Sequence, residues 1–189
     1  MRQVYVHDAW VWMRSVEGAD AIGAAITVAL CGDWQHEPPC PLAPVPPSGL
    51  LPMAARLASQ NPEYLLQMSG FDPARLSSVV LATLRPFYFS NDVAPEILVE
   101  AANHLNAESP RALLDLSLRL HWALPVTNHR PLFVIGAEGD RVCSPDDVRA
   151  TARHHGVTAT ILPGLAHLLM LERKYVTVAK AIEGWLQTI

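Results

Sequence analysis

The sequence predicts an α/β fold built on a small parallel sheet with flanking helices. The clearest observations lie in the last third of the chain. An uninterrupted apolar run at 132–135 is typical of a strand that is covered on both faces. A capped helix and a second apolar strand follow this run, and a last amphipathic helix comes after them. Because strands and helices alternate, a parallel sheet with right-handed crossovers is favoured.

The helix between these two strands has strong local signals at both ends. Ser144 suits the N-cap, Pro145 suits the first turn, and the two aspartates that follow complement the helix dipole. Gly156 marks its end. The next strand is expected at 158–162. One apolar face of the last helix is formed by Tyr175, Val178, Ile182 and Trp185 or Leu186.

The earlier part of the chain predicts short strands and several helices. Strands are expected at 4–6 and 41–45, and a helix of small apolar residues at 19–30. Residues 50–122 have a helical pattern with polar breaks. Prolines punctuate this stretch at Pro73, Pro86, Pro95 and Pro110, and the last two suit first helical turns.

Composition narrows the classes of function. The 189 residues are 50% hydrophobic and 17% charged, as in a globular domain, and the net charge of −4 gives no reason to expect nucleic-acid binding. No apolar run approaches the ~20 residues of a membrane span, and the start lacks the pattern of a signal peptide. The three cysteines do not suggest a disulfide framework. A cytoplasmic location is therefore expected.

Two loops carry the candidate chemistry. Gly136-Ala-Glu-Gly-Asp140 follows the first apolar strand, and Pro163-Gly-Leu-Ala-His167 follows the second. Adjacent parallel strands bring such loops to one edge of the sheet, so a hydrogen bond between Asp140 and His167 is predicted. An acid that orients a histidine makes up two thirds of a hydrolytic triad. A turn-forming aspartate and a merely hydrogen-bonded histidine are the structural alternative.

Residues 131–187, with both of these loops, Ser144-Pro145 and Leu171-Glu172, resemble the C-terminal end of an α/β-hydrolase of the esterase and lipase-like branch. Phe89-Ser-Asn-Asp92 and Glu108-Ser-Pro-Arg-Ala112 resemble its helical cap. Ala43-Pro-Val-Pro-Pro-Ser-Gly49 resembles the strand end that leads into the cap.

The resemblance implies a reduced parallel sheet with flanking helices and an inserted helical cap. The partial core would comprise 1–49 and 123–189, and the cap 50–122. Asp140 would be the triad acid, His167 the general base, and the substrate a small ester or acyl compound in an apolar pocket lined by the cap. No cofactor is implied.

The nucleophile of such an enzyme is not identifiable. No Gly-x-Ser-x-Gly occurs, and the spacing back from Ala43 places the expected elbow at Ala21. Asp20 could serve as a carboxylate nucleophile, although a helix N-cap is the simpler role. Ser15 and Ser48 have the features of ordinary loop or helix serines.

The region before that elbow is short. Residues 1–18 have room for one strand at most and lack an oxyanion loop, so the chain has the pattern of a truncated or rearranged member of the family. Weak or absent ester hydrolysis is therefore expected. The alternative is an inactive remnant that acts as a self-associating structural or interaction module.

Two further groups of residues have weaker patterns. Cys31, His36 and Cys40 match no standard zinc spacing, so no metal site is expected. Trp10 and Trp12 belong to an apolar stretch that fits the core or a partner-binding surface. A sheet without its first strands would expose an edge, so association into at least a dimer is predicted.

Overall fold

The computed structural model describes residues 2–6, 9–13, 26–27, 41–42, 46–69, 78–103, 117 and 132–189. In these ranges, β1 (Arg2–Val6) and β2 (Ala9–Met13) form an antiparallel ribbon. A second sheet has the order β3-β4-β5-β6. Its strands are Ile26–Thr27, Pro41–Leu42, Val134–Ala137 and Ala159–Leu162. The pairs β4–β5 and β5–β6 are parallel.

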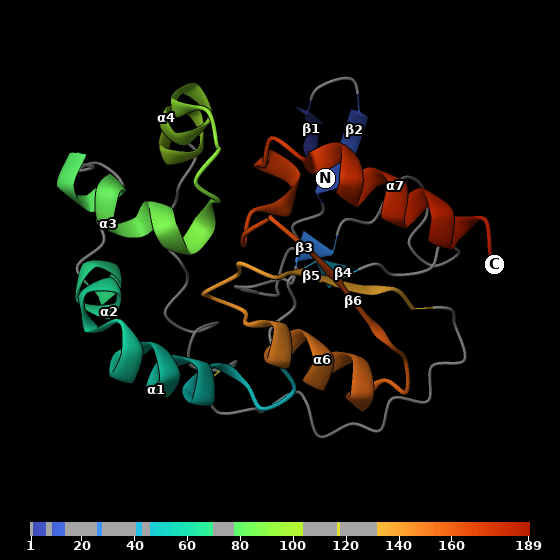
Figure 1. The fold of residues 1–189 in the computed structure, drawn as a ribbon, viewed down its shortest axis with the longest axis horizontal. Helices are drawn as coiled ribbons and strands as arrows, with labels where there is room; N and C mark the ends of the chain where they lie inside the picture. Colours follow the sequence, from blue (N-terminus) through green and yellow to red (C-terminus); the bar gives the residue numbers. More distant parts are fainter. Residues whose placement is uncertain are drawn as a thin grey trace.

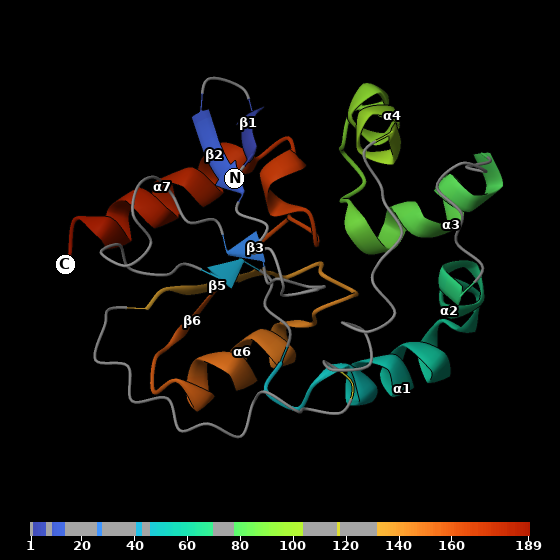
Figure 2. The same cartoon turned by 180° about the vertical axis from the view of Figure 1, so that it is seen from behind.

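Helices lie on both sides of the four-stranded sheet. After β4 come α1 (Leu50–Gln60), α2 (Pro62–Ser69), α3 (Ser78–Tyr88) and α4 (Pro95–Asn103), which we call the helical segment. Helix α6 (Pro145–His154) connects β5 to β6, and η2 (Leu169–Leu171) precedes α7 (Tyr175–Leu186). Figures 1 and 2 show α6 and α7 on opposite faces of the sheet, with the helical segment beside its carboxyl edge. The predicted α/β class with a small parallel sheet and flanking helices is confirmed.

Strand β5 is buried on both faces, as its apolar run predicts. Val134 packs with Val148 and Ala152 of α6, whereas Ile135 packs with Val178 and Ile182 of α7. Gly136 faces α6 so closely that a Cβ atom there would lie 2.6 Å from Cγ2 of Val148. The helix therefore reaches its packing position only because residue 136 has no side chain.

The helical segment shares the larger core with the sheet and α7. Buried side chains from α1, α2 and α3 contribute to this core, namely Leu57, Tyr64, Leu84 and Phe87. They belong to the same cluster as Ile135 and Val178. No helix within the described ranges is long and apolar enough to cross a membrane.

Several sequence predictions hold at the level of single elements. Helix α6 begins with the expected cap: the Ser144 hydroxyl accepts from the N–H of Asp147, and the Asp147 carboxylate accepts from the N–H of Ser144. Pro95 opens α4, and α7 buries Val178 and Ile182.

Other predictions need correction. The helix expected at 19–30 cannot run through Ile26 and Thr27, which form β3 and pair antiparallel with β4. These β-branched residues favour extended backbone. The strand expected at 132–135 is shifted to 134–137, because its ladder with β6 begins at Val134. The expectation that residues 1–18 have room for one strand at most is wrong, because β1 and β2 both lie in this range and pair as an antiparallel ribbon.

Candidate active site

The two loops predicted to carry chemistry leave the sheet side by side. Ala137 of β5 pairs with Leu162 of β6, so both strands end at the same edge. We call residues 138–143 the acid loop and residues 163–168 the histidine loop. The N–H of Glu138 donates to the Leu162 carbonyl oxygen (2.9 Å), and the N–H of Gly139 donates to that of Leu165 (3.0 Å). A Cβ atom at Gly139 would lie 2.8 Å from the Leu165 oxygen, so this close contact requires glycine.

Asp140 and His167 form the predicted hydrogen bond. The Nδ1–H of His167 donates to Oδ2 of Asp140 at 2.9 Å, which confirms the predicted contact. Oδ1 of the same carboxylate accepts from the backbone N–H groups of Val142 and Cys143, both at 2.8 Å. The carboxyl group is buried, and these three donors fix its orientation. It can therefore hold the imidazole in the tautomer that carries its proton on Nδ1.

The imidazole ring of His167 also contacts Tyr88 of the helical segment. The Tyr88 and His167 rings form a T-shaped contact, with 5.6 Å between their centroids. The hydroxyl groups of Tyr88 and Tyr64 are hydrogen-bonded at 2.8 Å, and burial raises the pKa of Tyr64 far above its ordinary value. The His167 side chain is 20% exposed, and among the described residues its Nε2 has no hydrogen-bond partner. Nε2 is thus available to a reacting group.

Cys143 lies beside this pair but is a poor reacting group. Its sulfur, an Asp140 oxygen and a His167 nitrogen all lie within 4.8 Å of one another. Burial, followed by the charges of Asp140 and Asp147, raises the pKa of the Cys143 thiol. A neutral, buried thiol is neither a good nucleophile nor a good metal ligand. Both carboxylate oxygens of Asp140 already accept hydrogen bonds, so the geometry is that of a hydrogen-bonded pair rather than a metal site.

A side chain of the helical segment supports the acid loop from outside. Arg56 of α1 donates to the carbonyl oxygens of Arg141 (3.1 Å) and Val142 (2.8 Å), and to Oδ2 of Asp147 (2.8 Å). No local pattern in the sequence points to Arg56, Tyr64 or Tyr88, because their partners lie far along the chain.

Of the candidate nucleophiles, only Ser48 lies among the described residues. Ser48 lies in the turn before α1, and no hydrogen bond among the described residues joins its hydroxyl to His167. Ser15, Asp20 and Ala21 lie outside the described residues, as do Cys31, His36 and Cys40. Trp10 and Trp12 lie in β2, whose backbone alone is described.

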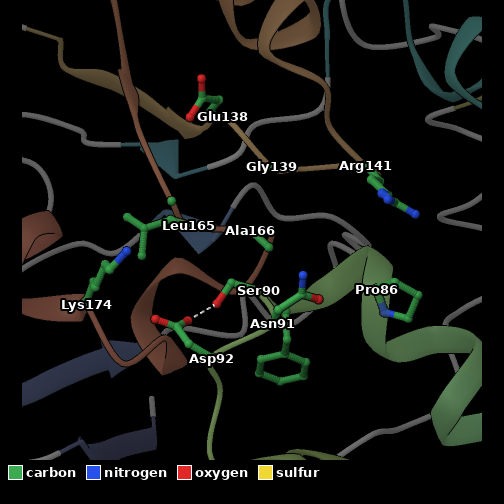
Figure 3. Close-up of a pocket in the computed structure, with 12 residues that line it drawn as sticks. Pro86, Ser90, Asn91, Asp92, Glu138, Gly139, Arg141, Leu165, Ala166 and Lys174 are labelled. Atoms are coloured by element: carbon green, nitrogen blue, oxygen red, sulfur yellow. Dashed lines mark hydrogen bonds between the residues drawn. The ribbon is translucent and has the colours of Figure 1, made fainter.

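A cavity of about 430 Å³ adjoins the two loops. It is lined by Pro86, Phe89, Ser90, Asn91, Asp92, Glu138, Gly139, Arg141, Gly164, Leu165, Ala166 and Lys174 (Figure 3). Two acids and two cations are among these residues, and His167 is not. This cavity therefore differs from the apolar substrate pocket expected from the sequence, which remains a prediction.

Comparisons with known proteins give coarse similarities of fold. Rv0554 from Mycobacterium tuberculosis is 18% identical with a TM-score of 0.49, and the match covers 79% of this chain and 56% of that one. A malate-bound thermophilic esterase from Thermogutta terrifontis is 19% identical with a TM-score of 0.38, covering 72% and 48%. Another thermophilic esterase structure is 19% identical with a TM-score of 0.40, covering 79% and 55%.

The chain spans about half the length of each of these proteins. No protein-family model matches the chain, and no curated protein matches it. Because all three TM-scores are below 0.5, these similarities are limited to the coarse arrangement of the fold.

Proposed function

We propose that this chain is an α/β-hydrolase-like protein that hydrolyses small carboxylic esters, with Asp140 as the triad acid and His167 as the general base. The observation that carries the proposal is the 2.9 Å hydrogen bond from His167 Nδ1 to Asp140 Oδ2. In this proposal, 50–122 is the cap, and 1–49 with 123–189 form the core.

The hydrogen bond gives His167 a definite chemical role. With its proton on Nδ1, the neutral imidazole presents a lone pair on Nε2 and can take the proton of an attacking hydroxyl group. The imidazolium that forms is stabilised by the Asp140 carboxylate. Nε2 then gives the proton to the leaving alcohol, and a water molecule activated in the same way releases the acid.

The nucleophile is left unassigned in the proposal. Its oxygen must approach Nε2 to roughly 2.6–3.2 Å in the reacting complex. Because Ala21 occupies the best-aligned elbow position and has no such oxygen, we expect slow turnover. Ser15, Ser48 and Asp20 are the candidates to test.

The test is hydrolysis of p-nitrophenyl acetate and butyrate by the parent protein and by three variants. We expect His167→Ala and Asp140→Asn to reduce the rate to background, because the base or its orientation is lost. His154→Ala is the matched control, since this exposed histidine lies outside the pair and should leave the rate unchanged.

Labelling with a fluorophosphonate, followed by peptide mapping, would identify an activated serine. We expect labelling at one residue in the parent and none in His167→Ala. Equal rates in the parent and His167→Ala would reject the proposal and favour the self-associating remnant.

A further inference from the structure

The backbone N–H groups on either side of His167 are connected to the end of α3 and the turn that follows it, one directly and the other through Glu172. The N–H of Leu168 donates directly to the carbonyl oxygen of Tyr88 at 2.9 Å. The N–H of Ala166 donates to Oε1 of Glu172 at 3.1 Å, and the same oxygen accepts from the N–H of Ser90 at 2.7 Å. The placement of the histidine loop therefore depends on the helical segment as well as on the sheet.

Glu172 connects the histidine loop to the turn between α3 and α4. It is only 1% exposed, and its second oxygen, Oε2, accepts from the hydroxyl of Ser90. Among the described residues, no lysine, arginine or histidine forms an ion pair with it. A buried carboxylate without a cation is unfavourable unless hydrogen bonds satisfy its oxygens. An apolar side chain would avoid this cost but would leave the N–H groups of Ser90 and Ala166 without an acceptor.

We infer that Glu172 is a positioning residue for His167, which couples the docking of the α3–α4 turn to the placement of the imidazole. This inference rests on the proposed role of His167. Glu172 does not touch the ring, and it acts through the backbone on either side of the histidine. A displacement of about 1 Å in a reacting group can reduce a rate about 100-fold.

The hydroxyl of Ser90 has a second acceptor. It lies 2.5 Å from Oδ1 of Asp92 as well as from Oε2 of Glu172, and Figure 3 shows it directed at Asp92 beside Ala166. One hydroxyl hydrogen cannot serve both carboxylates at once. The backbone N–H of Ser90, which has no competing acceptor among the described residues, is therefore the more constant donor to Glu172. Oε1 of Glu172, which accepts from both Ser90 and Ala166, is the atom that connects the turn to the histidine loop.

Three substitutions of Glu172 distinguish the effect of the length of the side chain, which places its acceptor oxygen, from the effect of its negative charge. Glu172→Gln keeps an oxygen at the same distance from the backbone but removes the charge. Glu172→Asp keeps the charge but is one methylene too short to reach both N–H groups. Glu172→Met has a similar length and no comparable acceptor.

The tautomer of His167 is the first quantity to measure, because it does not depend on turnover. Long-range ¹H–¹⁵N NMR correlations distinguish a proton on Nδ1 from one on Nε2, and His167→Gln identifies the signals. The parent and Glu172→Gln should carry the proton on Nδ1, whereas Glu172→Asp and Glu172→Met should show mixed tautomers.

The His167-dependent esterase rate is the second quantity. We expect Glu172→Gln to stay within about threefold of the parent, while kcat falls roughly 10- to 100-fold in Glu172→Asp, as for other partners that orient a functional histidine. KM should change little. Ile182→Val, a core substitution on α7, is the control for a general loss of stability.

The outcomes distinguish this inference from the proposed function. If Glu172→Asp keeps a proton on Nδ1 and Glu172→Gln does not, the charge matters rather than the reach, and the inference is wrong. It is also wrong if all three variants retain the parent tautomer. If His167→Ala leaves the esterase rate unchanged, the proposed function fails, while the tautomer measurement still decides whether Glu172 positions the ring. Even if Glu172→Met does not fold, the tautomers in Glu172→Asp and Glu172→Gln are sufficient to decide whether Glu172 positions the ring.

Discussion

Arg56 of α1 forms an ion pair with Asp147 of α6, with 2.8 Å between Nη2 and Oδ2, although 91 residues separate them in the sequence. The same guanidinium also donates to the carbonyl oxygens of Arg141 and Val142. A single side chain thus connects the helical segment to the acid loop and to the start of α6. Since Arg56 and Asp147 are mostly shielded from solvent, the pair should contribute more than an exposed one.

We predict that Arg56→Met lowers the free energy of unfolding by about 1–3 kcal/mol, because it leaves a partly buried carboxylate and two carbonyl oxygens without their donor. Arg56→Lys should fall between this variant and the parent, since an ammonium group cannot form the same fork of hydrogen bonds. Urea unfolding of the three proteins measures the differences. Equal midpoints for Arg56→Met and the parent would contradict the prediction.

A second prediction concerns two glycines with opposite surroundings. Gly136→Ala should destabilise the protein by about 1–3 kcal/mol, because the new methyl group would overlap Val148. Gly184→Ala should stabilise it by up to ~1 kcal/mol, because this helical position has no atom within 4 Å of the added Cβ. Thermal unfolding of both variants provides the measurement, and a shift of the same sign in both would be inconsistent with this packing.

The third prediction is a pH dependence at the end of α6. Burial, followed by the neighbouring His154, lowers the pKa of His155 in the folded protein. The unfolded chain, in which a histidine titrates near its ordinary value of ~6.5, therefore binds this proton more readily. Its protonation favours unfolding as the pH falls from about 7 through that value.

The variant His155→Asn should therefore lose less stability than the parent on acidification, and asparagine is tolerated at a helix end. Melting temperatures of both proteins at several values between about pH 7.5 and 5.5 test this difference. Parallel curves for the two proteins would show that His155 makes no such contribution.

The fourth prediction is self-association. Each helix of the helical segment exposes a large apolar side chain, namely Leu51, Leu66, Val79 and Val99. Such exposure is typical of an interaction surface where the side chains form a continuous patch. We predict at least a dimer by light scattering at micromolar concentration.

Val79→Glu and Val99→Glu should shift this equilibrium toward the monomer. Val176→Glu, at an exposed position of α7, serves as the control and should not shift it. A monodisperse monomer in the parent protein would contradict the prediction.

The sequence predicts those site residues that directly follow a recognisable strand. Asp140 and His167 each follow a recognisable apolar strand, and parallel pairing then brings their loops to the same edge of the sheet. The helix expected at 19–30 shows the limit of such signals. A run of small apolar residues does not distinguish a helix from a strand, and pairing with Leu42 gives Ile26 an extended backbone instead.

The supporting contacts could not be predicted in the same way. Arg56, Ser90 and Tyr88 act on loops more than 75 residues away, as the positions of their partners show. Their partners are mostly backbone groups, which have no side-chain identity to recognise. Only the folded arrangement reveals that Glu172, an ordinary residue in the sequence, is almost completely buried.

The shared core also restricts how a substrate can reach His167. Leu57, Leu84 and Phe87 are packed in one cluster with Ile135 and Val178, so swinging the helices outward as a rigid gate would expose all three. At roughly 1.5–3 kcal/mol for each side chain, that motion would consume much of the ~5–15 kcal/mol that holds a small domain together. In the proposed function, a substrate would therefore approach the partly exposed side chain of His167 with these helices remaining in place.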